Sequence, residues 1–260
     1  MARFAQWLFD EAASGTTPTT VDDDSGVSPD ADFTTIDYGG GSWTTNGAGR
    51  GLTGQATQAL NASSKVYAEL DGATAASVIA QIDTPDDFFF VWWLPDTTDG
   101  ETTIGVYVTD TGAIGAFDEN STGGFWLMET GTGIVQDGDV IAFVFDPGNA
   151  TEADRGRIYR NGSRVATPTY TAPSGALDPG GPGTTADLYT GSAFGDPAGA
   201  TIYYLAAYDS ALSDAEVATL SSAIATDNDA DPEAGGGGGT SSPVTGSSHR
   251  NIRTNAVYRM

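Results

Sequence analysis

An Asn-Gly pair between two short runs of strand-forming residues is the feature that most limits how this chain can fold. Residues 155–170 read RGRIYRNGSRVATPTY, with Asn161-Gly162 near the centre. A two-residue turn of type I′ needs a positive φ angle at both central residues, and Asn followed by Gly adopts those angles most readily. The segment therefore predicts a β-hairpin that turns at this pair.

Apolar runs elsewhere in the chain also predict strands. Residues 87–94, DFFFVWWL, are almost continuously apolar, as in a central strand covered on both faces, so Trp92 and Trp93 would point in opposite directions. Residues 102–118, TTIGVYVTDTGAIGAFD, predict a second hairpin with its turn at Asp110–Gly112. The remaining candidate strands are FAQWLF (4–9), FTTIDY (33–38), SKVYAEL (64–70), ASVIAQI (76–82), GFWLMET (124–130), DVIAFVFD (139–146) and ATIYYLAAYD (200–209).

Helical periodicity replaces the strand pattern after the last of these segments. In SALSDAEVATLSSAI, residues 210–224, Ser213 and Glu216 have the spacing of a capping box. The apolar positions that recur at helical spacing are Leu212, Val217, Leu220 and Ile224. We therefore expect an all-β fold with one short C-terminal helix.

The sequence divides into one large domain and an appended tail. A chain of 260 residues with 39% hydrophobic residues can bury one sizeable core. After Ile224 the sequence becomes acidic and then rich in Gly and Ser, a composition typical of a linker. We expect a β domain at residues 1–226, a linker at 227–248 and a basic segment, HRNIRTNAVYRM, at 249–260.

The order of elements between residues 141 and 220 resembles a known family. Its features are a strand (IAFVFD), a Y-x-N-G hairpin at Tyr159–Gly162, a short Gly191-Ser192 strand, a strand at Thr201–Tyr208 and an A-L-S-x-A-E helix at Ala211–Val217. This order resembles the laminin-G-like domains of the concanavalin A-like superfamily. The resemblance implies a jelly-roll sandwich of two antiparallel sheets that binds glycans or proteins through its rim loops or concave face, although a fold alone does not determine function.

The charge of the chain is strongly one-sided. Thirty-five acidic residues stand against ten basic ones, for a formal net charge of −25. A folded domain with so many like charges repels itself in dilute buffer. This repulsion is screened at about 1 M salt, where the Debye length falls to about 3 Å. We therefore expect a protein from a high-salt habitat, since the composition resembles that of extreme halophiles and their viruses; an ordinary acidic protein is the alternative. Nucleic acid is not expected as a partner, because phosphate binding needs clustered Lys and Arg.

The residue patterns of common hydrolytic enzymes are missing from the sequence. Glycosidases need two carboxylates that flank one bond, and no E-x-D-x-E pattern occurs. The one histidine, His249, lies in the predicted tail, and the chain has no Cys, which disfavours Ser/His/Asp and thiolate chemistry. From these patterns we expect a protein that is not an enzyme, with a glycoside hydrolase as the alternative.

Two weaker patterns suggest ligand sites. Asp227, Asp229 and Asp231 alternate in DNDAD, and carboxylate oxygens are ligands that calcium prefers; in an Asp-rich chain such a cluster also arises from solvation alone. Trp43 and Tyr38 lie among glycines in DYGGGSWTTNGAGRG, where an exposed ring can stack on a sugar. A Trp packed in the core beneath a loop is the alternative reading of Trp43.

The last twelve residues reverse the charge of the body that precedes them. We expect their apolar side chains to enter a groove on another subunit and their Arg side chains to meet acidic surface. An undocked extension is the alternative. The residues expected to dock are Arg250, Ile252, Arg253, Val257, Tyr258 and Arg259.

The N-terminal segment bears on where the protein acts. MARFAQWLFDEAASG has one Arg and an apolar run broken by Gln6 and Asp10, which is typical of neither a signal peptide nor a membrane span. Together with the acidity, the sandwich and the tail, this favours a virion surface protein of a tailed virus, made in the host cytoplasm. We expect a homo-oligomeric head decoration, turret or tail fibre that attaches to host-surface glycans or glycoproteins. A cellular lectin-like or surface-layer module is the alternative.

Overall fold

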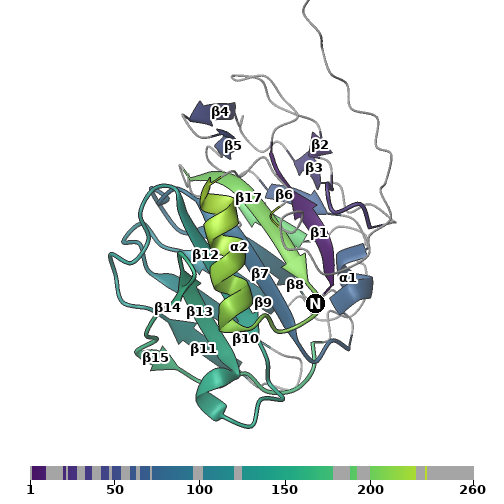
Figure 1. Ribbon diagram of the computed structural model, residues 1–260, viewed down its shortest axis with the longest axis vertical. Helices are drawn as coiled ribbons and strands as arrows, with labels where there is room; N and C mark the ends of the chain where they lie inside the picture. The colour runs from purple at the N-terminus through teal and green to yellow at the C-terminus, as the bar shows by residue number, and fades with distance from the viewer. Residues whose placement is uncertain are drawn as a thin grey trace, which may run out of the picture.

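Two antiparallel β-sheets pack face to face and enclose the main hydrophobic core (Figure 1). The computed structural model describes residues 2–9, 20–21, 23–27, 33–36, 42–46, 49–53, 59–62, 65–70, 72–95, 102–119, 125–177, 188–191, 200–226 and 232. All strand pairings within these residues are antiparallel. The predicted all-β sandwich with a C-terminal helix is confirmed.

The strands of the two sheets are interleaved along the chain. The eight-stranded sheet has the order β14 (Ser163–Arg164), β13 (Gly156–Arg160), β12 (Asp139–Phe145), β7 (Ala76–Ile82), β17 (Thr201–Tyr208), β5 (Gly49–Thr53) and β4 (Ser42–Asn46), and β1 (Arg3–Trp7) also pairs with β17. The nine-stranded sheet has the order β15 (Thr169–Tyr170), β11 (Phe125–Glu129), β10 (Ile114–Glu119), β9 (Thr102–Val108), β8 (Phe89–Pro95), β16 (Leu188–Gly191), β6 (Ala59–Ala62), β3 (Phe33–Ile36) and β2 (Thr20–Val21).

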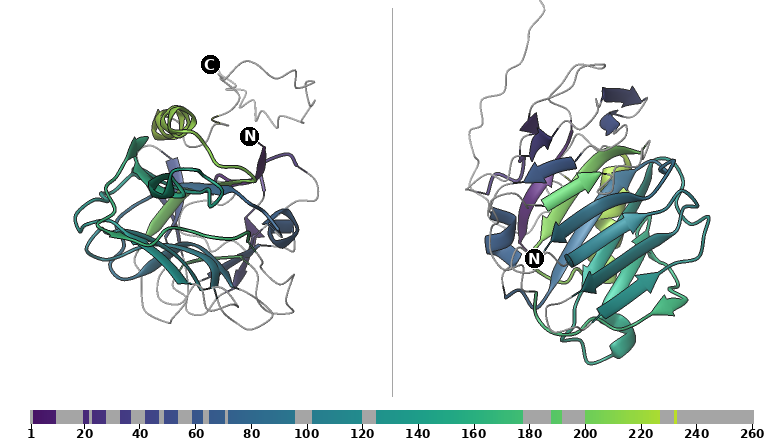
Figure 2. Two further views of the ribbon diagram at one scale, coloured as in Figure 1. Left: turned by 90° about the horizontal axis from the view of Figure 1, so that it is seen from below. Right: turned by 180° about the vertical axis from the view of Figure 1, so that it is seen from behind.

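Helix α2 (Asp214–Thr226) packs on the outer face of the eight-stranded sheet (Figure 2). This explains why every residue of β12 is buried. Ile141 and Phe143 point into the core between the sheets. Val140 and Val144 point the other way and belong to a second cluster of buried residues, which includes Val217 and Leu220 of α2. A strand covered on both faces reads as a continuous apolar run, as the sequence does here. The nine-stranded sheet lies on the side of the sandwich away from α2.

Local sequence chemistry holds α2 against the sheet. The predicted turn is confirmed, because Asn161 has φ of 48° and Gly162 has φ of 76°. The capping box is also confirmed, since Glu216 Oε2 accepts hydrogen bonds from the Ser213 backbone N–H at 2.8 Å and from its hydroxyl at 2.7 Å. Asp214 adds a third contact, as its Oδ1 accepts a 2.6 Å hydrogen bond from the hydroxyl of Tyr159 on β13.

One predicted strand is wrong. SKVYAEL forms a short helix, α1 (Lys65–Leu70), whose Val66 and Leu70 are buried in the core. Residues four apart share one face of a helix, and Lys, Ala, Glu and Leu are good helix formers. A further 3₁₀ turn, η1, covers Glu152–Asp154. No helix within the described ranges is long and apolar enough to cross a membrane.

Candidate functional site

Five aromatic side chains gather on the outer face of the nine-stranded sheet. Phe88 precedes β8, which carries Phe90 and Trp93, while Tyr107 lies on β9 and Phe117 on β10. We call this group the aromatic cluster. The residues between them on β8 and β9, among them Phe89, Trp92 and Val106, belong to the core. Three adjacent strands therefore bring rings from separate parts of the sequence onto one surface.

A β-bulge at Val91 places two of these rings side by side. Phe90 pairs with Tyr107 and Trp92 pairs with Val106, so Val91 is an extra residue on β8. In a regular strand, positions 90 and 93 would face opposite sides; the extra residue restores them to the same side. The Phe90 and Trp93 rings stack with centroids 5.5 Å apart and an interplanar angle of 21°.

The other rings extend this stack across the sheet. Phe88 stacks on Tyr107 with centroids 4.6 Å apart and meets Phe90 edge-on at 4.9 Å. Phe117 lies 6.0 Å from Tyr107 and 6.2 Å from Phe90. These are the separations at which aromatic pairs attract each other. The cluster is therefore a packed surface rather than a set of isolated side chains.

Two glycines let the rings lie flat on the sheet. Gly105 on β9 stands opposite Phe117, and Gly115 on β10 stands opposite Tyr107. A Cβ at Gly105 would lie 2.5 Å from Phe117 Cε1, and one at Gly115 would lie 2.0 Å from Tyr107 Cζ. Glycine inside a strand usually marks such a close approach.

The cluster combines partly exposed rings with one polar pair. Phe90 and Tyr107 are buried, whereas Phe88, Trp93 and Phe117 are partly exposed. The Tyr107 hydroxyl donates a 2.7 Å hydrogen bond to Glu129 Oε2 on β11. Burial, and then the hydrogen bond to Glu129 and its charge, raise the pKa of Tyr107 well above its ordinary value. Tyr107 therefore stays protonated, and Glu129 supplies acceptor oxygens at the edge of the rings.

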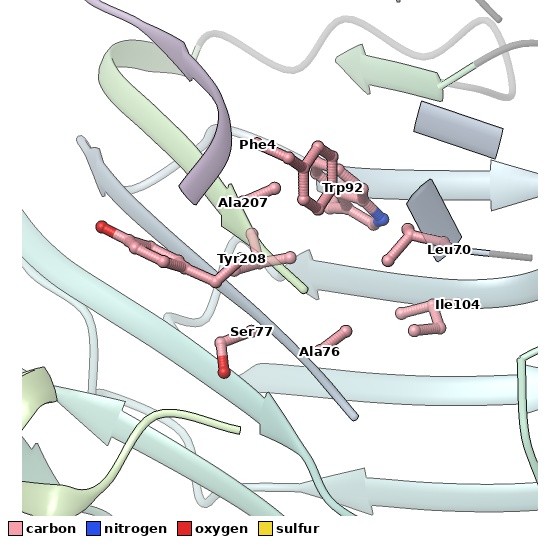
Figure 3. Close-up of a pocket in the computed structure, with 9 residues that line it drawn as sticks. Phe4, Leu70, Ala76, Ser77, Trp92, Ile104, Ala207 and Tyr208 are labelled. Atoms are coloured by element: carbon pink, nitrogen blue, oxygen red, sulfur yellow. The ribbon is translucent and has the colours of Figure 1, made fainter. Parts of the chain in front are cut away.

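The interior of the sandwich holds no comparable site among the described residues. A cavity of about 10 Å³ lies between the sheets, lined by apolar groups of Phe4, Leu70, Ile104 and Ala207 beside Trp92 (Figure 3). Ligand pockets for small molecules measure about 300–1,000 Å³. This cavity could hold about one water molecule, so it is a packing defect rather than a ligand site.

Most of the site residues that the sequence suggested lie outside the described residues. These are Tyr38, Asp227, Asp229, Asp231, Arg250, Ile252, Arg253, Val257, Tyr258 and Arg259. The backbone of Trp43 lies on β4, paired with Leu52 at the end of the eight-stranded sheet, so Trp43 belongs to a different sheet from the aromatic cluster. Among the residues with a described position, no group of three or more His, Asp or Glu could hold a metal ion.

The sequence reasoning missed the aromatic cluster. The signal was the presence of glycine inside two predicted strands, TIGVYV and AIGAF, each with an aromatic residue two positions on. A glycine in a strand interior suggests that something lies close over the backbone. Which ring covers which glycine depends on the register of neighbouring strands, which the local pattern does not contain.

The comparisons with known proteins agree on the fold. No family model and no curated protein matches the sequence. The binding domain of botulinum neurotoxin DC, in complex with rat synaptotagmin II, has a TM-score of 0.57 at 8% identity over 86% of this chain and 52% of its own. The Ruminococcus gnavus IT-sialidase CBM40 bound to α2,3-sialyllactose has a TM-score of 0.50 at 14% identity over 66% of this chain and 96% of its own. At these identities the likeness establishes the fold alone, a β-sandwich.

A third structure corrects the expectation about catalysis. The Trypanosoma rangeli sialidase has a TM-score of 0.49 at 12% identity over 84% of this chain, which spans only 32% of the sialidase chain. The prediction that the chain is not an enzyme is contradicted by the sialidases among the matching structures. The prediction relied on carboxylate spacing along one strand, and a fold can bring catalytic groups together from separate strands.

Proposed function

We propose that the chain is a carbohydrate-binding β-sandwich whose ligand stacks on the aromatic cluster. The observation that carries this proposal is the set of partly exposed rings of Phe88, Trp93 and Phe117, packed in one surface beside the Tyr107–Glu129 hydrogen bond. Sugar rings have apolar faces that pack on aromatic rings, and their hydroxyls need fixed acceptors such as a carboxylate. The cluster supplies both.

The fold comparisons support a binding role of this kind. CBM40 of the Ruminococcus gnavus enzyme is bound to α2,3-sialyllactose, and the neurotoxin domain is in complex with synaptotagmin II. The second of these favours a protein receptor as another candidate ligand. A glycan array and a host-protein blot distinguish a glycan ligand from a protein receptor, since only a protein with a carbohydrate-binding face binds oligosaccharides that carry no protein.

The biological setting is part of the proposal. We place the protein on the surface of a tailed virus from a high-salt habitat, where it attaches to host glycans as a head decoration, turret or tail fibre. The net charge of −25 supports the high-salt setting. The basic segment at residues 249–260 would hold the domain, residues 1–226, to other virion subunits through the linker at 227–248. Particles that incorporate a chain lacking residues 249–260 normally would contradict this anchoring role.

The experiment is a glycan array probed with the wild-type protein and with Trp93→Ala in molar KCl. Losing one stacking ring should weaken retention about tenfold, which corresponds to about 1.4 kcal/mol. Tyr170→Ala is the control, because it removes a partly exposed ring from β15, outside the cluster. Equal retention by the wild type and Trp93→Ala would rule out the cluster as the binding face.

A further inference from the structure

The strands of the sheet that carries the aromatic cluster contain no basic residue. No Lys, Arg or His occurs between Lys65 and Arg155, an interval that contains all of β8, β9, β10 and β11. The other five strands of the nine-stranded sheet, which read TV, FTTI, ALNA, TY and LYTG, have no basic residue either. The sheet that carries the cluster is therefore built entirely without positive charge.

The strands that do carry positive charge belong to the opposite sheet. Strands β1, β5, β13 and β14 of the eight-stranded sheet contain Arg residues. Three of these are paired with carboxylates: Arg157 with Asp214 at 3.1 Å, Arg160 with Asp139 at 2.6 Å, and Arg164 with Asp154. These three guanidinium groups are therefore already paired with carboxylates, and they come from a different sheet from the cluster.

Within the described residues, a negatively charged side chain lies at the cluster. Glu129 bonds Tyr107 and stands opposite Gly115, in the row of residues over which the Tyr107 ring lies. An anionic ligand on this face would lose water against apolar rings and meet a carboxylate. None of the nine strands of this sheet carries a guanidinium group to form the paired hydrogen bonds that carboxylates and phosphates favour. An uncharged sugar meets none of these penalties.

We infer that the aromatic cluster selects uncharged saccharides and discriminates against anionic ones such as sialosides. This inference rests on the proposed function and specifies its ligand class. It separates this chain from the CBM40 of similar fold, whose structure contains α2,3-sialyllactose.

Matched pairs of glycans test the inference. The array carries neutral oligosaccharides, each beside its sialylated form, including lactose and α2,3-sialyllactose. We expect the protein to bind the neutral glycans, and to bind the sialylated form of each at least tenfold more weakly in 0.1 M salt. The difference should shrink near 1 M salt, where the Debye length is about 3 Å.

The outcomes separate the two proposals. Preferred or equal binding of sialylated glycans would overturn the charge selection and leave carbohydrate binding intact. Retention of no glycan at all would overturn both.

A charge variant at the edge of the cluster gives an independent readout. Leu127 is partly exposed on β11 and stands opposite Phe117. Leu127→Lys adds a positive charge there, and we expect it to raise sialylated binding relative to neutral binding severalfold. Leu127→Gln is the matched control, of similar length and without charge. An equal ratio in both variants would contradict the inference.

A second variant covers the case in which Leu127→Lys does not fold, as judged by circular dichroism. Glu129→Gln removes the negative charge and keeps an oxygen that can accept the Tyr107 hydrogen bond. It should narrow the gap between neutral and sialylated glycans severalfold. An unchanged gap would show that charge at this face does not determine the selection.

Discussion

The ring of Tyr107 lies over the backbone of Gly115 in the neighbouring strand, so closely that a Cβ atom at Gly115 would stand 2.0 Å from the ring carbon Cζ. The same two strands form the reverse pair, in which the ring of Phe117 on β10 covers Gly105 on β9. Each strand thus supplies one glycine and one ring. The flat surface of the aromatic cluster depends on both pairs, because any side chain at either glycine would lift a ring from the sheet.

Gly115→Ala tests this packing. We expect a loss of about 1–3 kcal/mol in the free energy of unfolding, because the added methyl group overlaps the Tyr107 ring. Urea unfolding measures it. Gly131→Ala is the control, since Gly131 is exposed with no atom within 4 Å of a Cβ, and it should change stability by less than about 0.5 kcal/mol. Equal unfolding midpoints for the two variants would show that the ring moves aside at no cost.

Gly162→Ala tests the contact between the hairpin turn and α2. A Cβ at Gly162 would lie 2.7 Å from the Cα of Ala218, a backbone atom of the helix. Gly175→Ala is the matched control, since both glycines have φ near +80° but Gly175 has open space around it. Both variants should lose about 1–2 kcal/mol from the backbone angle, and Gly162→Ala about 1–3 kcal/mol more in urea unfolding. Identical losses would mean that the turn does not brace the helix.

Local chemistry explains which parts of the fold were predictable from sequence. Asn161-Gly162 and the Ser213–Glu216 box are determined by residues within a few positions of one another, and both have the predicted geometry. The opposite orientation of Trp92 and Trp93 is also confirmed, since Trp92 is in the core and Trp93 stacks on Phe90 outside it. In contrast, SKVYAEL is too short for its period to separate strand from helix.

The aromatic cluster was beyond local patterns for a different reason. It requires the extra residue Val91 in β8 and the pairing of β8, β9 and β10 in one register. A shift of one residue would turn Tyr107 into the core and Val106 outward. Register is fixed by contacts between residues distant in sequence. The aromatic residues were therefore visible in the sequence, but the contacts between their rings could not be predicted from it.

Acid should weaken the attachment of α2. The hydrogen bond from Tyr159, and then the charge of Arg157, lower the pKa of Asp214; hydrogen bonds from Ser213 lower that of Glu216. A carboxylate with a lowered pKa stabilises the fold above its ordinary value of about 4 and loses that contribution as the pH falls through its folded value. Because Asp214 is 66% exposed, its contribution is at most about 1 kcal/mol.

The pH dependence of Asp214→Asn measures this contribution. The wild type should be more stable than the variant at pH 6 in urea unfolding, and the difference should shrink as the pH falls below about 4. A difference that is constant over this range would assign the effect to packing rather than to charge.

Salt should stabilise the wild-type protein. With a net charge of −25, repulsion between carboxylates opposes folding in dilute buffer and is screened at about 1 M KCl. Each kcal/mol of repulsion removed should raise the thermal midpoint by about 2–4 °C, measured by calorimetry. A midpoint that is the same in 0.05 M and 2 M KCl would contradict the high-salt setting.

The position of the saccharide is tested most directly by the indole Nε1–H signals of ¹⁵N-labelled protein, titrated with an oligosaccharide retained on the array. Trp92 provides the internal control, because it adjoins Trp93 in the sequence but is fully buried in the core. Binding at the aromatic cluster should shift the Trp93 signal to saturation and leave the Trp92 signal unchanged. A Trp93 signal that stays constant while calorimetry records binding would place the sugar elsewhere and contradict this account.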